Sequence, residues 1–335
     1  MNLKRIVLFF LILAAAAGTL PARAAVTLKL ATMAPEGSIW MNALNKARDE
    51  IDAATGGEVK LKFYPGGIMG SEKDVLFKVK MGQLQGGGFM GYAIGQICPD
   101  ANALMFPMLL RDYAEADAVF AALRPYLEEK VRAAGWEAMG WTEVGFSYMY
   151  GVKPIRNLDQ MRLTKVWRLE AAMLLELFAK ADIVSIPMAI TDVLTSLQTG
   201  ALETVFSPPT AAVAVQWPSR IHYYNTARLT YAFGGVFFSQ AAWKSVPEAH
   251  RETVRRILDG ACSSLTPLVR KSDAEALEYM RGTGIEAQEP SPEEYQGFVD
   301  VADAALGNIR GKVFSAEAWD RVQAALADAR AAAAP

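Results

Sequence analysis

Regular patterning begins after residue 25, where apolar and polar side chains alternate. Apolar residues occupy every second position of 26–30, which predicts a strand with one buried face. A turn is expected at 34–38, followed by a helix from residue 39 to about 54 with Ser38 as its N-cap. A second strand is expected at 59–64. Because strand–helix–strand crossovers are right-handed, the two strands should be parallel neighbours in one sheet.

Strand-like and helix-like segments keep alternating along the chain, without an internal repeat. Further strands are expected within 136–151, 165–169, 182–188 and 201–209. Further helices are expected at 72–81, 114–134, 171–180, 192–200, 247–280, 292–306 and 315–330, with a kink at Pro267. Two α/β halves, with the chain passing between them more than once, are the simplest organisation that fits this order.

The first 24 residues have the features of a secretory signal peptide. Lys4 and Arg5 precede an apolar run at 6–17, and the small residues Ala22 and Ala24 follow it. The run is about a dozen residues long, which is shorter than the roughly 20 residues that a membrane-spanning helix needs. We therefore expect cleavage near Ala24 and export of a soluble mature protein.

The composition argues against nucleic acid and metal ions as partners. The full chain has a formal net charge of −2, and loss of the basic leader makes the mature protein more acidic, whereas nucleic acid is bound through basic patches. The chain has two histidines and no cluster of His, Cys and acidic residues at metal-ligand spacing. Cys98 and Cys262 are too few to define a disulfide framework, so a bond between them stays open at this stage.

Two short patterns resemble nucleotide-binding or catalytic motifs but lack the necessary context. The run 86–91 contains G-x-G-x-x-G, yet no apolar strand precedes it as a dinucleotide fingerprint requires. The stretch GFSYM lacks the second glycine of a nucleophile elbow, and His222 and His250 have no recognisable serine or cysteine partner. We therefore expect a protein that is not an enzyme and needs no cofactor.

Large aromatic residues recur at the ends of predicted strands and in loops. In open α/β sheets the carboxyl ends of the strands face the ligand crevice, so these residues are candidate walls of a pocket with few charges. Taken singly, each is more readily explained as a core residue. The set comprises Trp40, Phe89, Tyr92, Trp141, Phe146, Trp167, Phe206, Trp217 and Phe233.

Three segments, in this order, are similar to those of a known protein family. They read LKLATMAPEGSIW, VKLKFYPGGIMGSEKDVLFKVKMGQL and DVLTSLQTGALETVFSPPTAAVAVQW. Over essentially all of its mature length, the chain resembles the extracytoplasmic solute-binding proteins of tripartite ATP-independent periplasmic (TRAP) transporters. The resemblance implies a periplasmic protein that closes on a small solute and delivers it to the subunits of a TRAP-type membrane permease.

The resemblance also implies the architecture. The expected fold class is α/β, with two domains, a ligand cleft between them and several chain crossovers. We assign residues 25–150 with about 235–275 to domain I, and 151–234 with about 276–330 to domain II.

The chain departs from the family at the positions that matter most for acid binding. Most members read Lys-Ile-Arg where this chain has Lys165-Val166-Trp167, and their arginine pairs with a carboxylate of the solute. The family's asparagine before proline is replaced here by Ser207. Arg168 follows Trp167, but one step along a strand turns a side chain to the opposite face, so we expect Glu170 or solvent to satisfy it.

The tryptophan places the chain closest to a subgroup that lacks the carboxylate-binding arginine. Some members of this subgroup are linked with periplasmic tetratricopeptide-repeat proteins and with hydrophobic solutes, which implies the same partners here. After the strand, however, the subgroup usually reads Glu-Gly-Asp-Pro, whereas this chain reads Glu170-Ala171-Ala172-Met173.

The main hypothesis is therefore a binding protein for a solute with substantial apolar surface. A second hypothesis keeps organic-acid binding, with a strand irregularity turning Arg168 into the cleft. A third, of another class, is an interaction subunit whose cleft docks a periplasmic partner protein. The candidate ligand-binding residues are Glu36, Trp40, Phe89, Tyr92, Trp141, Phe146, Trp167, Arg168, Glu170, Phe206, Ser207 and Phe233.

Overall fold

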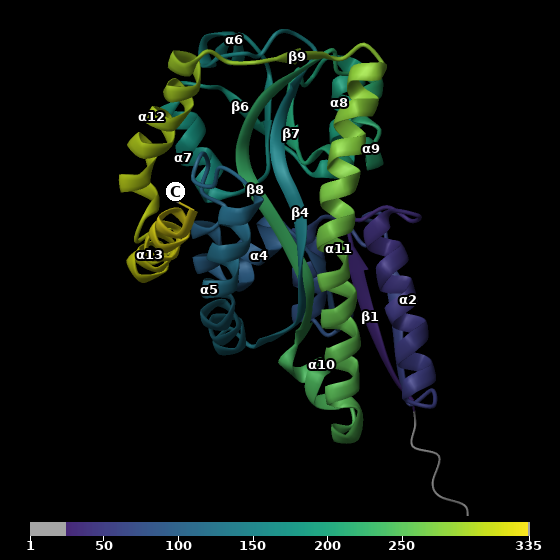
Figure 1. Ribbon diagram of the computed structural model, residues 1–335. Coiled ribbons are helices and arrows are strands. Elements are labelled where there is room, and N and C mark those ends of the chain that lie inside the picture. Colours follow the sequence, from purple (N-terminus) through teal and green to yellow (C-terminus); the bar gives the residue numbers. More distant parts are fainter. Residues whose placement is uncertain (1–24, 334–335) are drawn as a thin grey trace, which may run out of the picture.

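The computed structural model describes residues 25–333, and the expected signal peptide at 1–24 lies outside the described residues. The described chain forms one mixed sheet of nine strands with helices on both faces (Figure 1). Eight strands follow the order β2-β1-β3-β8-β4-β7-β5-β6, and the ninth, β9, pairs with β8. The expected α/β fold class is confirmed.

The elements have the following bounds. The strands are β1 (Val26–Thr32), β2 (Val59–Tyr64), β3 (Gly86–Phe89), β4 (Trp136–Gly151), β5 (Val166–Arg168), β6 (Ser185–Pro187), β7 (Thr204–Ser207), β8 (Tyr223–Ser239) and β9 (Glu286–Gln288). The α-helices are α2 (Ile39–Ala54), α3 (Glu72–Lys80), α4 (Gly91–Ile97), α5 (Tyr113–Ala133), α6 (Leu158–Arg162), α7 (Ala172–Lys180), α8 (Ile190–Thr199), α9 (Pro209–Ala214), α10 (Gln240–Ser245), α11 (Glu248–Gly282), α12 (Pro292–Ile309) and α13 (Ala316–Ala333). Two 3₁₀ turns are η1 (Pro99–Ala103) and η2 (Trp217–Ser219).

The first strand, helix and second strand form the unit that the sequence predicts. β1 and β2 are parallel, with Val26 opposite Val59. Between them, α2 begins after Ser38, whose hydroxyl accepts a hydrogen bond from the Met41 N–H at 3.3 Å. This bond satisfies one free amide of the first turn, and the apolar face of α2 packs against β1, β2 and α11.

Two long antiparallel strands, β4 and β8, pass through both halves of the sheet. At one end β8 pairs with β3, where Phe89 lies opposite Gly235. At the other end β4 pairs with β7, where Tyr148 lies opposite Ser207. The sequence indicated several strand candidates in 136–151, whereas the structure has one strand. Helices cover both of its faces, so its residues are buried almost without alternation and no break is visible in the pattern.

The C-terminal helices join the two halves from the outside. α11 is a single helix of 35 residues that continues through Pro267 and lies along the length of the sheet (Figure 1). α12 packs on α7, whereas α13 packs on α5. The assignment of about 276–330 to domain II, like the rest of the domain division, stays a prediction.

A bulge at the centre of β4 brings a glycine against a buried acid. The pairing with β8 shifts register between Glu143 and Gly145, and Gly145 has a φ of 110°. A side chain here would overlap the carboxylate of Asp273 on α11. Asp273 accepts hydrogen bonds from the Thr210 N–H at 2.9 Å and from the Tyr113 hydroxyl at 3.4 Å. The glycine thus lets α5, α9 and α11 meet at one carboxylate.

Replacing Gly145 by alanine should destabilise the fold, because the methyl group would meet Asp273 and the residue would be held at a positive φ. We expect Gly145→Ala to lower the free energy of unfolding in urea by about 2 kcal/mol or more. The matched control is Gly260→Ala, at an exposed turn of α11 with no neighbouring atom within 4 Å. Gly260→Ala should raise the free energy of unfolding in urea by roughly 0.5–1 kcal/mol. Equal effects of the two substitutions would contradict the role of the bulge.

Asp273 should also make stability depend on pH. Burial raises the pKa of its carboxyl from the ordinary 3.8 to about 6, although its hydrogen bonds lower it. The folded protein therefore binds a proton that the unfolded chain releases, so the stabilising contribution is complete below the unfolded pKa and is lost as the pH rises through 6. Compared with Asp273→Asn, the wild type should gain roughly 2–3 kcal/mol in urea denaturation when the pH is lowered from about 7 to about 4. A difference independent of pH would show that folding does not raise the pKa of Asp273.

Candidate functional site

A cavity of about 260 Å³ lies between the halves of the sheet. Its walls come from β4, β5, β7 and β8, from the start of α4, and from helices α6, α7 and α12. Apolar side chains dominate, among them Met90, Met105, Met108, Met149, Met161 and Met173. Of the described residues that line it, Arg168 alone is charged. A mostly apolar cavity with few polar groups is the usual form of a small-molecule site.

Trp167 lies in the wall of this cavity with little exposed surface. The residue is 4% exposed, and its indole N–H donates a hydrogen bond to the Met188 carbonyl at 3.0 Å. Its ring meets Trp217 edge to face, with the ring centroids 5.5 Å apart. Because the N–H group is already bonded within the protein, Trp167 offers the cavity an apolar surface and no free donor.

Arg168 also lines the cavity, although alternation along β5 places it on the opposite face from Trp167. One guanidinium nitrogen, Nη1, donates to the Leu169 carbonyl at 3.3 Å. Nε is buried and has no hydrogen-bond partner among the described residues. A buried donor without a partner is costly, which makes Arg168 the polar group in the cavity most in need of an acceptor.

The expectation that Glu170 satisfies Arg168 was wrong. Glu170 pairs instead with Lys73 of α3, with Nζ and Oε2 3.3 Å apart. The two side chains are 56% and 66% exposed, so water screens the pair and it contributes little to stability. It does connect the first half of the sheet with the segment that follows β5.

Phe206 and Ser207, at the end of β7, also line the cavity. The Phe206 ring stacks on Phe178 of α7, with the centroids 5.7 Å apart. Ser207 is 5% exposed and gives the wall a small polar group. Four of the twelve candidate residues therefore lie in this one cavity.

Two further candidates, Trp40 and Phe89, line a smaller adjoining cavity of about 70 Å³. The two cavities share part of their walls, formed by Met90, Val144, Ile190 and Ala211. The indole N–H of Trp40 is buried without a hydrogen-bond partner among the described residues. The small cavity thus extends the site toward β1 and α2.

The other six candidates lie outside both cavities. Trp141 and Phe233 pack together in an aromatic cluster beneath α5, with centroids 5.7 Å apart, and Phe146 packs on Tyr113 at 5.0 Å. Tyr92 lies in the first turn of α4, and Glu170 is paired at the surface as described. The exposed Glu36 accepts a hydrogen bond from the Asn45 amide at 3.2 Å. Ligand contact by any of the twelve residues stays a prediction.

Glu72 is a polar residue beside the cavity that sequence reasoning did not single out. Its carboxylate accepts hydrogen bonds from the N–H groups of Met90, at 2.6 Å, and Ala93, at 2.9 Å, at the start of α4. Burial raises the pKa of the Glu72 carboxyl to about 7, against the opposing effect of these hydrogen bonds. Through these bonds Glu72 fixes the backbone between Met90 and Ala93, of which Met90 and Gly91 line the cavity. Its spacing of 18 residues from Met90 gives no signal in the sequence.

Several kinds of chemistry find no support in the part of the chain that the structure describes. No group of three or more His, Cys, Asp or Glu side chains there could hold a metal ion. Within residues 25–333, no helix has both the length and the apolar character to cross a membrane. Cys98 and Cys262 are buried free thiols, so no disulfide bond joins them in the structure.

Comparisons with known proteins show the family of the chain. The chain matches the family described as bacterial extracellular solute-binding protein, family 7, over residues 30–311, which include every wall of the larger cavity. The sialic acid-binding periplasmic protein of Vibrio cholerae is 22% identical over 302 residues, which cover 88% of this chain and 92% of that protein.

Two solved structures share the fold. The sugar acid-binding protein of Advenella mimigardefordensis, in complex with galactonate, superposes with a TM-score of 0.85 at 16% identity, covering 91% of this chain and 99% of that chain. The TRAP periplasmic solute-binding protein of Xanthobacter autotrophicus, with bound β-D-galacturonate, gives 0.83 at 18% identity, covering 90% and 99%. The chain therefore belongs to family 7 of the bacterial extracellular solute-binding proteins.

Proposed function

We propose that this protein captures a solute with a substantial apolar part in the cavity between its halves. As the family implies, it then delivers the solute to the membrane subunits of a TRAP-type permease. The observation that carries the proposal is the lining, in which six methionines and other apolar side chains surround one charged residue. A solute rich in hydroxyl groups would leave many of them without partners there, at a cost of roughly 1–3 kcal/mol each.

We also propose that the chain belongs to the subgroup of the family that lacks the carboxylate-binding arginine. Trp167 supports this, because it occupies the position expected for that arginine and uses its N–H group inside the protein. The same assignment carries with it a periplasmic tetratricopeptide-repeat partner. Independently of it, the features of residues 1–24 support removal of a signal peptide near Ala24. Methionine side chains adapt to irregular ligands, which fits a hydrophobic solute.

A second candidate adds an acidic group to the solute. It is favoured by Arg168, whose buried Nε lacks a partner among the described residues, and by the diversion of Glu170 to Lys73. Charge-assisted hydrogen bonds from a guanidinium to a carboxylate are about twice as strong as neutral ones. The apolar lining and this arginine are compatible in one ligand with a polar end and an apolar body.

The first test is to identify the natural solute. The protein would be purified from its own periplasm, and native mass spectrometry would compare its mass before and after denaturing extraction. Release of a molecule with a hydrocarbon or aromatic body supports the proposal. Release of a sugar acid or another small polyhydroxy compound contradicts it.

Trp167→Ala should weaken both folding and binding. We expect the free energy of unfolding in urea to fall by about 3–5 kcal/mol, because a buried indole leaves a large cavity. Trp167→Phe is the matched control: it keeps an apolar ring and loses the hydrogen bond to Met188, at a cost of about 1 kcal/mol. In calorimetric titration, the affinity of Trp167→Phe for the released solute should lie within threefold of the wild-type affinity. A loss of more than tenfold in Trp167→Phe would show that the N–H group binds the solute.

Arg168→Met separates the two candidates, because methionine keeps the apolar stem and removes the charge. If an acidic group is held by the guanidinium, calorimetric titration should show a loss of affinity of about tenfold or more. If the solute is bound by its apolar part alone, affinity should stay within threefold and the protein should become more stable. Lys73→Met provides the control for loss of an exposed cation that does not line the cavity.

A further inference from the structure

Arg168 and Phe206 lie level with each other at the ends of neighbouring strands. β5 and β7 are parallel, with Val166 opposite Thr204, and two further residues along each strand lead to Arg168 and Phe206. Phe206 in turn lies opposite Met149 of β4. Side chains that are level on paired strands point to the same face of a sheet. A cation and an aromatic ring therefore line the cavity next to each other.

The surroundings of Phe206 suit a second aromatic ring. Its side chain is half-buried, and Phe178 packs on it with the ring planes at 29°, while both residues line the cavity. Three methionines of the lining belong to the same apolar cluster, namely Met108, Met149 and Met161. Contacts of an aromatic ring with other rings and with thioether sulfurs are favourable beyond the apolar area that they bury. A saturated group of the same size gains only the buried area.

One edge of the Arg168 guanidinium is unpaired. Nη1 donates to the Leu169 carbonyl at 3.3 Å, whereas Nε and Nη2 make no hydrogen bond among the described residues. The edge formed by Nε and Nη2 is one with which a carboxylate can pair through two parallel hydrogen bonds. The cavity thus offers an acid one complete site for its carboxylate, beside the ring of Phe206.

The volume of the cavity limits the size of the ring system. A cavity of about 150 Å³ holds benzene, so the cavity of about 260 Å³ leaves about 110 Å³ for other groups. At roughly 30 Å³ for each small group, this remainder takes a carboxylate and a linker of about one carbon. A second ring would not fit in addition.

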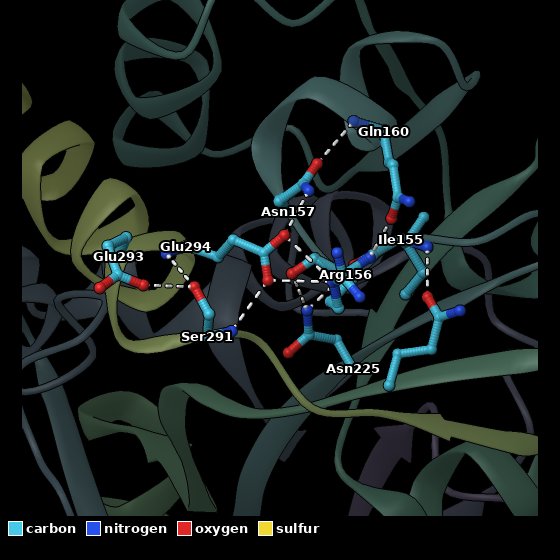
Figure 2. Close-up of polar contacts among 9 residues, drawn as sticks. Ile155, Arg156, Asn157, Gln160, Asn225, Ser291, Glu293 and Glu294 are labelled. Atoms are coloured by element: carbon cyan, nitrogen blue, oxygen red, sulfur yellow. Dashed lines mark hydrogen bonds and ion pairs between the residues drawn. The ribbon is translucent and has the colours of Figure 1, made fainter.

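Polar contacts fix two of the walls that set this volume. Met161 of α6 and Phe298 of α12 line the cavity, and they belong to the same apolar cluster. At the start of α12, Glu294 accepts hydrogen bonds from the Asn157 amide at 2.6 Å and from Arg156 Nε at 3.0 Å (Figure 2). Asn157 is the N-cap of α6, so these bonds tie the two helices together. Walls joined in this way do not separate easily to admit a larger ligand.

We infer that the solute is an aromatic carboxylate with a single ring, held by Arg168 through its acid and by Phe206 through its ring. The inference rests on the proposed function, in the form with an acidic group, and names the class of solute. A rigid ring also loses less conformational freedom on binding than a flexible chain of the same volume.

The test compares an aromatic acid with its saturated counterpart. Phenylacetate and cyclohexylacetate would be titrated calorimetrically into wild-type protein from which bound solute has been removed. Phenylacetate should bind about tenfold more tightly or better, because only its ring gains the contacts with Phe206 and the thioethers. Buried area alone predicts the reverse order, because the cyclohexyl ring is the larger and more apolar of the two. Naphthylacetate, with two rings, should bind about tenfold more weakly than phenylacetate or worse.

Three variants assign the contacts. Phe206→Leu keeps an apolar side chain without a ring, so it should weaken phenylacetate about tenfold and leave cyclohexylacetate within about threefold of the wild type. Arg168→Met should weaken both acids alike, by about tenfold or more. Phe77→Leu is the matched control for loss of a ring, because Phe77 is 62% exposed and does not line the cavity. Its affinities for both acids should equal those of the wild type.

The outcomes separate the inference from the proposed function. Equal or tighter binding of cyclohexylacetate by the wild type overturns the aromatic class, although an apolar acid stands. A preference for phenylacetate that survives in folded Phe206→Leu, as judged by circular dichroism, overturns the role of Phe206. If that variant does not fold, the wild-type comparison decides. Absence of binding by both acids overturns the inference, whereas the proposed function itself fails only if the solute released from the native protein is polar throughout.

Discussion

The structure depends on the antiparallel pairing of β4 with β8. These two strands are the only part of the described sheet that belongs to both of its halves, and every other strand is added on one side or the other. The cavity lies where they pass from one half to the other, so its floor consists of residues whose positions are fixed by this ladder. The bulge at Gly145 interrupts the ladder at the same place and admits the carboxylate of Asp273 from α11. The pairing of β4 with β8, the bulge at Gly145 and one wall of the cavity thus involve the same segment of β4.

Around this segment, charge and apolar surface are distributed in a consistent way. Trp167 uses its indole N–H within the protein, while Arg168 lines the cavity without an acidic partner among the described residues. The Glu72 carboxylate accepts hydrogen bonds from backbone amides at the start of α4, so these bonds, and not Arg168, occupy its oxygens. The lining of the cavity is thus apolar apart from a few polar groups and one cation that has no acidic partner among the described residues.

The sequence was most informative where one periodicity applies. The unit formed by β1, α2 and β2 and the N-cap at Ser38 follow from alternation, helical spacing and a capping residue, and the structure has all of them. The number of strands in 136–151 could not be predicted in this way, because helices cover both faces of β4 and its residues are buried almost without alternation. The side chains of the cavity were hard to find for a related reason: Met161 or Ala302 in the wall of an apolar pocket has the same sequence signature as a core residue. Trp141 and Phe233, which form real core, could not be told apart from Trp167 and Phe206. That Arg168 also lines the cavity could not be predicted, because the sequence does not show which elements lie beside the end of β5.

The methionine lining has a chemical consequence beyond shape. Oxidation converts a thioether into a polar, chiral sulfoxide, and in Met90, Met149 or Met161 the new oxygen would lie in a wall that offers it few donors. Met149 is fully buried and Met161 is 4% exposed, so neither thioether is in contact with solvent to any extent. Oxidation of the methionine lining would therefore turn an apolar wall into a polar one without any change in the sequence.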